Sequence, residues 1–430
     1  MITTLVILIL ICLILINCPV FIALGVSGLV GIFLIGGMSS ITSLPMVIYS
    51  QIDGFILIAI PLFILMGEVL ANSGLGGGMF DCLSKWLSRL PGGLAIASVT
   101  ACAMFGAACG VSVAGVGAIG PLAVPEMLKK KYDERLASGS LAAAGALATL
   151  IPPSIVMVVY GSLASTSVAK LFIGGIIPGV VLTIMMSLYI AIAVVINPKL
   201  APPAEIDITW LDRFRSLKSI IPVALLGTLI LVCLYTGVAT PTEVAALGVV
   251  GAMLISRFVY KTLTIDVMKK VISNTTRATI SIMIIVASSQ CLGSYLNLAK
   301  VPEQVATLAL GTNLPPIGVI IVFMLALTVL GMFVDGISMI VITTPILLPA
   351  IISMGFDPLW YGIVLALNIE LAVISPPVGL NLYMMKSVVP QLHLEKIISG
   401  AIPFLMIEFL CLLIFIFFPQ LALWLPQFMG

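Results

Sequence analysis

A pair of adjacent prolines occurs twice in this chain, each time inside a long apolar run. The pairs are Pro152-Pro153 and Pro376-Pro377. A proline lacks a backbone N–H and its ring collides with the carbonyl four residues earlier, so two in succession interrupt a helix. Inside a membrane, the freed backbone groups must be satisfied by a cavity, by water or by an ion. Each pair therefore predicts a helix break that exposes backbone to a site.

The composition predicts that these runs cross a membrane. The chain has 430 residues, of which 61% are hydrophobic and only 8% are charged. Soluble domains carry about 25% charged residues. A membrane-spanning helix needs about 20 apolar residues, and the chain has room for roughly ten to twelve such segments. We expect an all-α polytopic membrane protein, and the net charge of +2 predicts no nucleic-acid partner.

The proline pairs belong to an internal repeat. Five pairs of prolines share one offset of 224 residues: Pro91 and Pro315, Pro121 and Pro345, Pro125 and Pro349, Pro152 and Pro376, and Pro153 and Pro377. The repeat predicts a first unit at 1–196, a linker at 197–218 and a second unit at 219–430. In each unit a stretch interrupted by Gly and Pro, at about 93–127 and about 315–354, precedes the broken helix, with breaks at 151–154 and 375–379.

The distribution of charge favours inverted topology. If each repeat has five transmembrane helices and one re-entrant helical hairpin, the odd number of spans inverts the second repeat. With both termini outside, in the periplasm, all of the 19 Lys and Arg residues except Lys170 and Lys300 lie inside. The linker 197–218 is then cytoplasmic, as the positive-inside rule favours. The interrupted stretches could instead be double spans, but their Gly and Pro residues favour hairpins.

The predicted hairpin tips are small and polar. They contain Gly110, Ser112 and Gly115 in the first repeat, and Gly336 and Ser338 in the second. Half-helices that meet at such tips direct partial charges at one point, and their carbonyls and hydroxyls suit a hard cation such as Na⁺. Inverted repeats with discontinuous helices are the usual construction of secondary-transporter sites. The alternative is that these small residues only let helices pack closely.

Several polar residues lie within apolar sequence. An intramembrane acid is a candidate functional residue, and Asp335 is either part of the site or the N-cap of a half-helix. Glu370 faces either the site or a partner helix, whereas for Glu68 and Glu408 a structural or inter-subunit role is favoured. Asn381 either ligates an ion or substrate, or caps the helix that restarts after the second break.

Other classes of function fit poorly. The Gly-rich segment 115–120 matches a dinucleotide-binding pattern, but no strand precedes it. His393 is the only histidine and is predicted to lie inside, which leaves an intramembrane enzyme without a catalytic base or metal ligands. A channel predicts polar stripes along whole helices, whereas polarity here concentrates at the breaks. We therefore expect a transporter and not an enzyme.

The motifs together resemble one family, the large membrane subunit (M, or DctM-type) of tripartite ATP-independent periplasmic (TRAP) transporters. The segments that carry the resemblance cover nearly the whole chain: 61–68, 114–126, 151–154, 331–335, 344–349 and 375–381. The resemblance implies the ion-transporter-superfamily fold, an elevator-type mechanism and a multi-pass location in the bacterial inner membrane. It also implies Na⁺-coupled import of an organic acid anion, no cofactor, and contact with membrane lipid. The implied partners are a small four-helix Q-type membrane subunit, expected as a separate polypeptide, and a periplasmic substrate-binding protein.

The resemblance also assigns residues to sites. The first Na⁺ site would lie between the first tip and the first break, with Gly110, Ser112, Gly115, Pro152 and Ser154. The second would lie between the second tip and the second break, with Gly336, Ser338, Pro376, Gly379 and Asn381. The substrate would contact Ser112, Ser338, Asp335 and Asn381. C4-dicarboxylates and sialic acid are both compatible with these motifs, and H⁺ coupling through Asp335 or Glu370 is the alternative to Na⁺.

Overall fold

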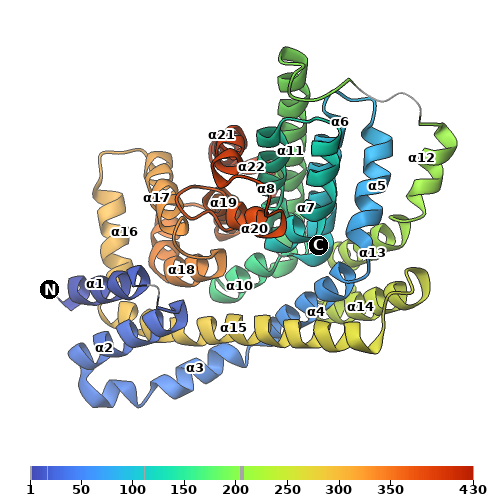
Figure 1. Ribbon diagram of the computed structural model, residues 1–430. Coiled ribbons are helices and arrows are strands. Elements are labelled where there is room, and N and C mark those ends of the chain that lie inside the picture. Colours follow the sequence, from blue (N-terminus) through green and yellow to red (C-terminus); the bar gives the residue numbers. More distant parts are fainter. Residues whose placement is uncertain (1, 17, 111, 204–207, 430) are drawn as a thin grey trace.

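The computed structural model describes residues 2–16, 18–110, 112–203 and 208–429, and its regular elements there are all helical (Figure 1). Six of these helices are long and apolar enough to cross a membrane, or up to nine spans if each bent helix pair counts as one. The expected all-α membrane architecture is therefore confirmed. The inverted relation of the two halves and the elevator mechanism remain predictions.

The first half contains eleven α-helices and one 3-10 turn. They are α1 (Ile2–Leu15), α2 (Val20–Ile41), α3 (Leu44–Ile52), η1 (Phe55–Ile58), α4 (Ala59–Ala71), α5 (Leu75–Leu87), α6 (Gly93–Cys109), α7 (Ser112–Lys129), α8 (Glu134–Ala144), α9 (Leu147–Leu150), α10 (Ile155–Leu163) and α11 (Val168–Ile196). The hairpin expected at about 93–127 corresponds to α6 and α7, which pack against each other. The helix expected to break at 151–154 corresponds to α8, α9 and α10.

The linker and the second half contain the remaining elements. They are α12 (Trp210–Leu217), α13 (Ile221–Tyr235), α14 (Pro241–Leu254), the π-helical η2 (Ile255–Val259), α15 (Ile265–Leu298), α16 (Val301–Gly311), α17 (Pro316–Gly331), α18 (Gly336–Ser353), α19 (Pro358–Val373), α20 (Leu380–Val388), α21 (Leu394–Phe417), α22 (Pro419–Leu423) and the short η3 (Pro426–Phe428). Helices α17 and α18 form the hairpin expected at about 315–354. Helices α19 and α20 flank the second break.

The apolar run at 279–296 predicts a helix over those residues, but α15 is much longer. It has 34 residues and begins after Thr264, whose side chain caps the backbone N–H of Val267. At 1.5 Å per residue, α15 is about 51 Å long, whereas the hydrocarbon core is about 30 Å thick. The first turns of α15 carry Lys269 and Lys270, so these turns do not belong to the apolar run that predicts the helix.

One group of helices is organised around α15. Figure 1 shows α15 as a long rod along the lower part of the view, with α2, α3 and α4 beside it, and α14 packs on α4. The contact between α2 and α15 is close because Gly28 lies there, where an added Cβ would be 2.4 Å from the backbone carbon of Cys291. Such close contacts through small residues are typical of membrane helix packing.

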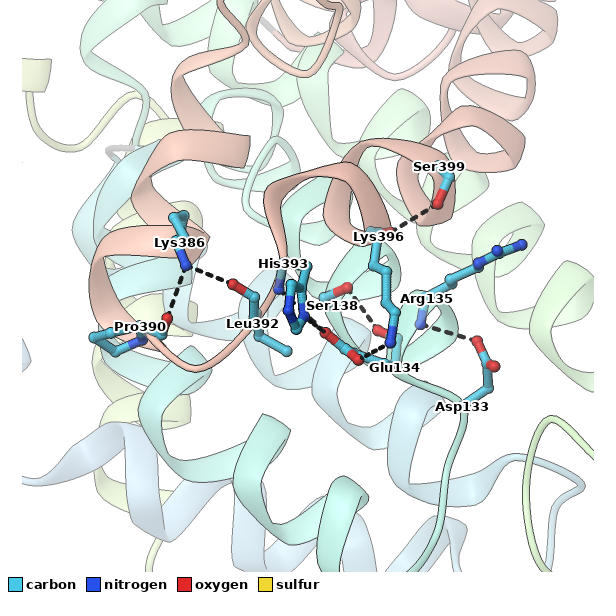
Figure 2. Close-up of polar contacts among 10 residues, drawn as sticks. All are labelled: Asp133, Glu134, Arg135, Ser138, Lys386, Pro390, Leu392, His393, Lys396 and Ser399. Carbon is cyan, nitrogen blue, oxygen red and sulfur yellow. Dashed lines mark hydrogen bonds and ion pairs between the residues drawn. The ribbon is translucent and has the colours of Figure 1, made fainter.

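A second group joins the two halves of the chain through α8 and α21. An added Cβ on Gly139 of α8 would lie 2.1 Å from the backbone of Gly400 on α21, so the helices touch backbone to backbone. At the start of α8, Glu134 accepts hydrogen bonds from the Lys396 ammonium at 2.5 Å and from the backbone N–H of His393 at 3.2 Å (Figure 2). The first-half broken helix and the second-half helix α21 therefore form one packed unit.

Candidate functional site

The first hairpin turns at Gly110. Helix α6 ends at Cys109, and Gly110 follows in the left-handed conformation (φ +68°), with its N–H donating to the carbonyl of Gly106 at 2.7 Å. A Cβ on Gly110 would lie 2.5 Å from the carbonyl oxygen of Pro153. The tip of the first hairpin is thus in direct backbone contact with the first break, as the first predicted Na⁺ site requires.

The two proline pairs interrupt their helices as predicted. After α9 ends at Leu150, the chain becomes helical again at Ile155, where the Ser154 hydroxyl accepts a hydrogen bond from the Met157 N–H at 3.4 Å. The second break separates Val373 from Leu380, and both proline pairs contain a cis peptide bond. The first pair is buried, whereas the second is half-buried to exposed.

The second hairpin tip is built around Asp335. Its carboxylate accepts hydrogen bonds from the backbone N–H groups of Ile337 and Ser338, each at 3.1 Å, and from the Ser338 hydroxyl. Asp335 is therefore the N-cap of α18, one of the two roles anticipated for it. Because the first-turn amides of α18 are already occupied by a carboxylate, they are less available to a substrate anion.

A buried hydrogen-bonded pair joins the first tip to the second break. The amide nitrogen of Asn381 donates to the Ser112 hydroxyl at 2.9 Å, and the Ser112 oxygen lies 3.2 Å from the Asn381 carbonyl oxygen. Ser112 opens α7 and Asn381 lies in the first turn of α20. Each tip was expected to pair with the break of its own repeat, but Ser112 makes its side-chain bond to the opposite one.

Both tips, together with residues on either side of each break, border one cavity of about 290 Å³. Four helices begin at this cavity: α7 with Ser112, α10 with Ile155, α18 with Gly336 and α20 with Leu380. Helix α6 ends there at Cys109. Helix N-termini present N–H groups and partial positive charge, whereas C-termini present carbonyls. The cavity therefore offers donors for an anion and carbonyl oxygens for cations within one space.

The described side chains around the cavity include acids and no bases. Glu68, Asp335 and Glu370 contribute to its lining, and the lining residues include no Lys, Arg or His. Glu68 belongs to α4, in the group of helices around α15, and accepts a hydrogen bond from the Asn274 amide of α15 at 3.0 Å. Its favoured role was structural, so its presence in the lining is a feature that sequence reasoning missed.

Glu370 is fully buried, and neither of its carboxylate oxygens has a hydrogen-bond partner among the described residues. The carboxylate of Glu408, from α21, lies near enough to interact electrostatically with it and is equally unpartnered within the described part of the chain. An isolated buried carboxylate is costly unless it is neutralised or paired. Glu370 therefore lies toward the site and also near a partner helix, the two alternatives that its position left open.

The remaining candidate residues fall into three groups. Gly110, Ser112, Asp335 and Gly336 line the cavity. Ser338 and Asn381 lie behind it, each hydrogen-bonded to a lining residue, while Ser154 caps α10. The break residues Pro152, Pro376 and Gly379 are not among the lining residues, and neither is Gly115, whose carbonyl accepts from the Cys102 thiol inside the hairpin.

Several lining positions were not anticipated, among them one polar residue of the first half and one residue of α15. Thr149 precedes the first break on α9, and Ala278 comes from α15. The Pro152-Pro153 pair, which begins three residues downstream, could have pointed to Thr149. No local sequence signal marks Ala278. Among residues 2–16, 18–110, 112–203 and 208–429, no group of three or more His, Cys, Asp or Glu side chains could hold a metal ion.

Discontinuous helices whose ends meet at one cavity, within an all-helical membrane protein, define a secondary-transporter type of membrane subunit. Comparisons with known proteins agree. The family model described as "Tripartite ATP-independent periplasmic transporter, DctM component" matches residues 7–421. The chain belongs to this family, as the sequence motifs predicted, and its relatives are transporter permeases rather than enzymes.

Two relatives and one solved structure illustrate the similarity. The chain is 34% identical to the C4-dicarboxylate TRAP transporter large permease protein DctM of Pseudomonas aeruginosa, over 95% of this chain and 94% of that protein. It is 30% identical to the ectoine TRAP transporter large permease protein TeaC of Halomonas elongata, over 98% of each. The crystal structure of the Alcanivorax borkumensis YdaH transporter has the same fold, with a TM-score of 0.60 and 16% identity over 90% of this chain and 89% of that one.

Proposed function

We propose that this chain is the large permease subunit of a cation-coupled importer of a small organic acid, with Na⁺ as the coupling ion. The acidic lining of the cavity is the main support for this function. Three carboxylates and no basic side chain line it. An organic anion would be repelled there, because charges interact strongly in a low-dielectric interior. Bound cations would offset this repulsion, which ties the binding of the anion to the binding of cations.

The Na⁺ ligands would come from the tips and the breaks. The backbone contact between Gly110 and Pro153 brings the carbonyl oxygen of Pro153, at the first break, to the first tip. The buried Ser112–Asn381 pair supplies a hydroxyl and an amide oxygen close by. Oxygen donors of this kind are the ligands that hard cations prefer. The second site would use the carboxylate of Asp335 and the backbone around Gly336 and Ser338.

The substrate carboxylate would lie between the tips, near the N-terminus of α7 and Ser112. The relatives are named for C4-dicarboxylates and for ectoine, which extends the expected range beyond dicarboxylate and sialic acid. Their shared feature is a carboxylate on a small polar solute. The helices around α15 would serve as a fixed scaffold, and the unit joined through α8 and α21 would move against it in an elevator-type motion.

The family description, a tripartite periplasmic transporter, supports an inner-membrane location and two partners. These would be a small four-helix membrane subunit and a periplasmic protein that delivers the substrate. The positive-inside distribution supports periplasmic termini and a cytoplasmic 197–218 linker.

The test is uptake by proteoliposomes that contain the chain and its two partners. Candidate radiolabelled substrates are offered with an inward gradient of Na⁺ or of choline at equal ionic strength. We expect uptake only with Na⁺. Equal rates in the two buffers would refute Na⁺ coupling.

Proton coupling is the second candidate. It is favoured by the burial of Glu370 at the cavity, where its carboxylate has no hydrogen-bond partner among the described residues. Asp335 is less suited, since it is engaged as a helix cap. Under this alternative, a pH gradient would drive uptake in choline, and Glu370→Gln would abolish that uptake. Glu303→Gln, at an exposed position on α16, is the matched control. Failure of a pH gradient to drive uptake would eliminate this candidate.

A further inference from the structure

The short helix α12 cannot cross the membrane. Its eight residues extend about 12 Å, and they include Asp212, Arg213 and Arg215. The helix meets the apolar α13 at an angle of 53°. Only together do α12 and α13 form a candidate bent span, and α13 is its apolar part. The bend tilts α12 away from the direction of α13 and toward the membrane surface. Figure 1 shows α12 beside α5 at the edge of the molecule.

One face of α12 is fixed on α5. The side chain of Arg213 is only 4% exposed, and its backbone carbonyl accepts a hydrogen bond from the Trp86 indole at 3.1 Å. Ser216 is also buried, and its hydroxyl lies 3.2 Å from the sulfur of Cys82. These contacts determine which face of α12 points outward.

The outward face is apolar and aromatic. Trp210, Leu211 and Phe214 are 58%, 63% and 60% exposed, and they lie at helical positions i, i+1 and i+4. Arg215 and the following Lys218 are exposed on the same side of the helix. We call these five residues the α12 ridge. Large apolar side chains beside Lys and Arg suit a membrane interface, because the apolar groups can enter the acyl boundary while the bases stay among the headgroups.

Basic groups surround the aromatic part of the ridge. The guanidinium carbons of Arg213 and Arg89 lie 5.0 Å and 5.8 Å from the centre of the Trp210 ring. Neither arginine, nor Arg215 or Lys218, forms an ion pair with a carboxylate in the described ranges of the chain. The charges of the exposed Arg89, Arg215 and Lys218 are therefore available to an external anionic group, although the exposed Asp212 offsets part of the charge of Arg215.

We propose that the α12 ridge binds the headgroup of an anionic phospholipid at the membrane–water interface. Trp210, Leu211 and Phe214 would enter the boundary with the acyl chains, where Trp is favoured. Arg89, Arg215 and Lys218 would face the phosphate, because juxtamembrane bases are attracted to anionic lipids. An anionic lipid fits the ridge because exposed apolar side chains lie there beside bases, at the end of a membrane-spanning segment. This combination matches the polarity and the charge of an anionic leaflet.

The ridge also has a position that matters for transport. Helix α12 lies between α11, which packs on hairpin helix α6, and α13, which packs on the scaffold helix α14. A lipid-bound ridge would hold this connection at the surface of the bilayer. Lipid charge would then influence the junction between the two halves of the chain.

The first experiment measures contact between lipid and Trp210. The full chain is placed in nanodiscs that contain phosphatidylcholine with a fraction of acyl-brominated phosphatidylglycerol or acyl-brominated phosphatidylcholine, and tryptophan quenching is recorded. We expect stronger quenching by the brominated anionic lipid. Trp210→Phe should remove this difference, whereas Trp424→Phe, at a position 55% exposed on the far C-terminal segment, should preserve it. Equal quenching by both lipids, or a difference that survives Trp210→Phe, overturns the proposal.

The second experiment tests the bases. The triple variant Arg89→Gln, Arg215→Gln and Lys218→Gln should weaken the anionic preference on the order of tenfold or more. The control Lys269→Gln and Lys270→Gln removes two exposed bases of α15 and should leave the preference intact. An equal loss in both variants would mean that net charge, not the ridge, attracts the lipid. Inorganic phosphate, added as a competitor for the bases, should have little effect on the quenching.

A third experiment tests whether the small membrane subunit, rather than lipid, covers the α12 ridge. The quenching is repeated with the small membrane subunit bound to the chain. We expect Trp210 to remain accessible to the brominated anionic lipid. Loss of quenching at Trp210 in that complex would assign the ridge to the subunit interface and overturn the lipid assignment.

Discussion

Substitution of Gly110 by Ala should separate the first hairpin tip from the first break. Gly110 adopts a left-handed conformation (φ +68°), and an added Cβ would lie 2.5 Å from the carbonyl oxygen of Pro153. That oxygen is part of the backbone, so the clash cannot be relieved by a side-chain rotation. The tip must move away, and the carbonyls proposed to hold Na⁺ must move apart.

The size of the effect follows from two contributions. An L-residue in the left-handed region costs about 1–2 kcal/mol, and forcing a methyl group into a packed site costs about 1–3 kcal/mol. Gly74 provides the matched control, because it has φ +78° and no atom within 4 Å of an added Cβ. Gly74→Ala therefore carries only the first cost. The difference between the variants is about 1–3 kcal/mol, or about 5- to 150-fold in an equilibrium constant.

The assay is the Na⁺ concentration that gives half-maximal uptake in proteoliposomes, with thermal unfolding of the purified chain measured in parallel. We expect Gly110→Ala to raise this concentration about 5- to 150-fold relative to Gly74→Ala. If both folded variants have the same Na⁺ dependence, the contact between the tip and the break does not form part of a Na⁺ site.

Three further predictions concern packing and the breaks. Ser112→Ala and Asn381→Ala should each destabilise the chain by about 1–3 kcal/mol, since each leaves a buried polar partner unsatisfied. The double variant should lose less stability than the sum of the two single variants. Additive losses in thermal unfolding would contradict this coupling. Gly139→Ala should lower the unfolding temperature more than Gly227→Ala, because Gly139 contacts backbone whereas nothing lies within 4 Å of a Cβ at Gly227. Replacing both prolines of the second pair by Ala should extend α19 through the break and abolish uptake; retained uptake would show that the break is dispensable.

The breaks and tips were predictable because their signals are local. A proline pair interrupts a helix through its own covalent structure, whatever surrounds it. Asp335 could likewise be recognised as a helix cap, since it immediately precedes the helix that it caps. The constant offset of the prolines added the information that the two breaks are related, although the inverted arrangement itself remains a prediction.

The parts that sequence reasoning missed depend on contacts between distant segments. Ser112 and Asn381 are 269 residues apart, and nothing in either motif indicates that they bond to each other. Glu68 reaches the cavity only because α4 packs against the first hairpin, where Gly67 lies close to the backbone of Cys109. Helices α3, α12 and α16 were not predicted, since they have only eight to eleven residues each and no long apolar run.

The carboxylates that line the cavity have a kinetic consequence. An organic anion that arrives before any cation meets three acidic side chains and no basic one among the described lining residues, so its residence time there should be short. Cations that arrive first reverse this bias, which predicts an ordered sequence in which the ion precedes the solute. The same order limits loss of solute from the cell, because solute alone would rarely occupy the carrier. In exchange experiments, raising Na⁺ should therefore lower the apparent Km for the solute before it changes the maximal rate.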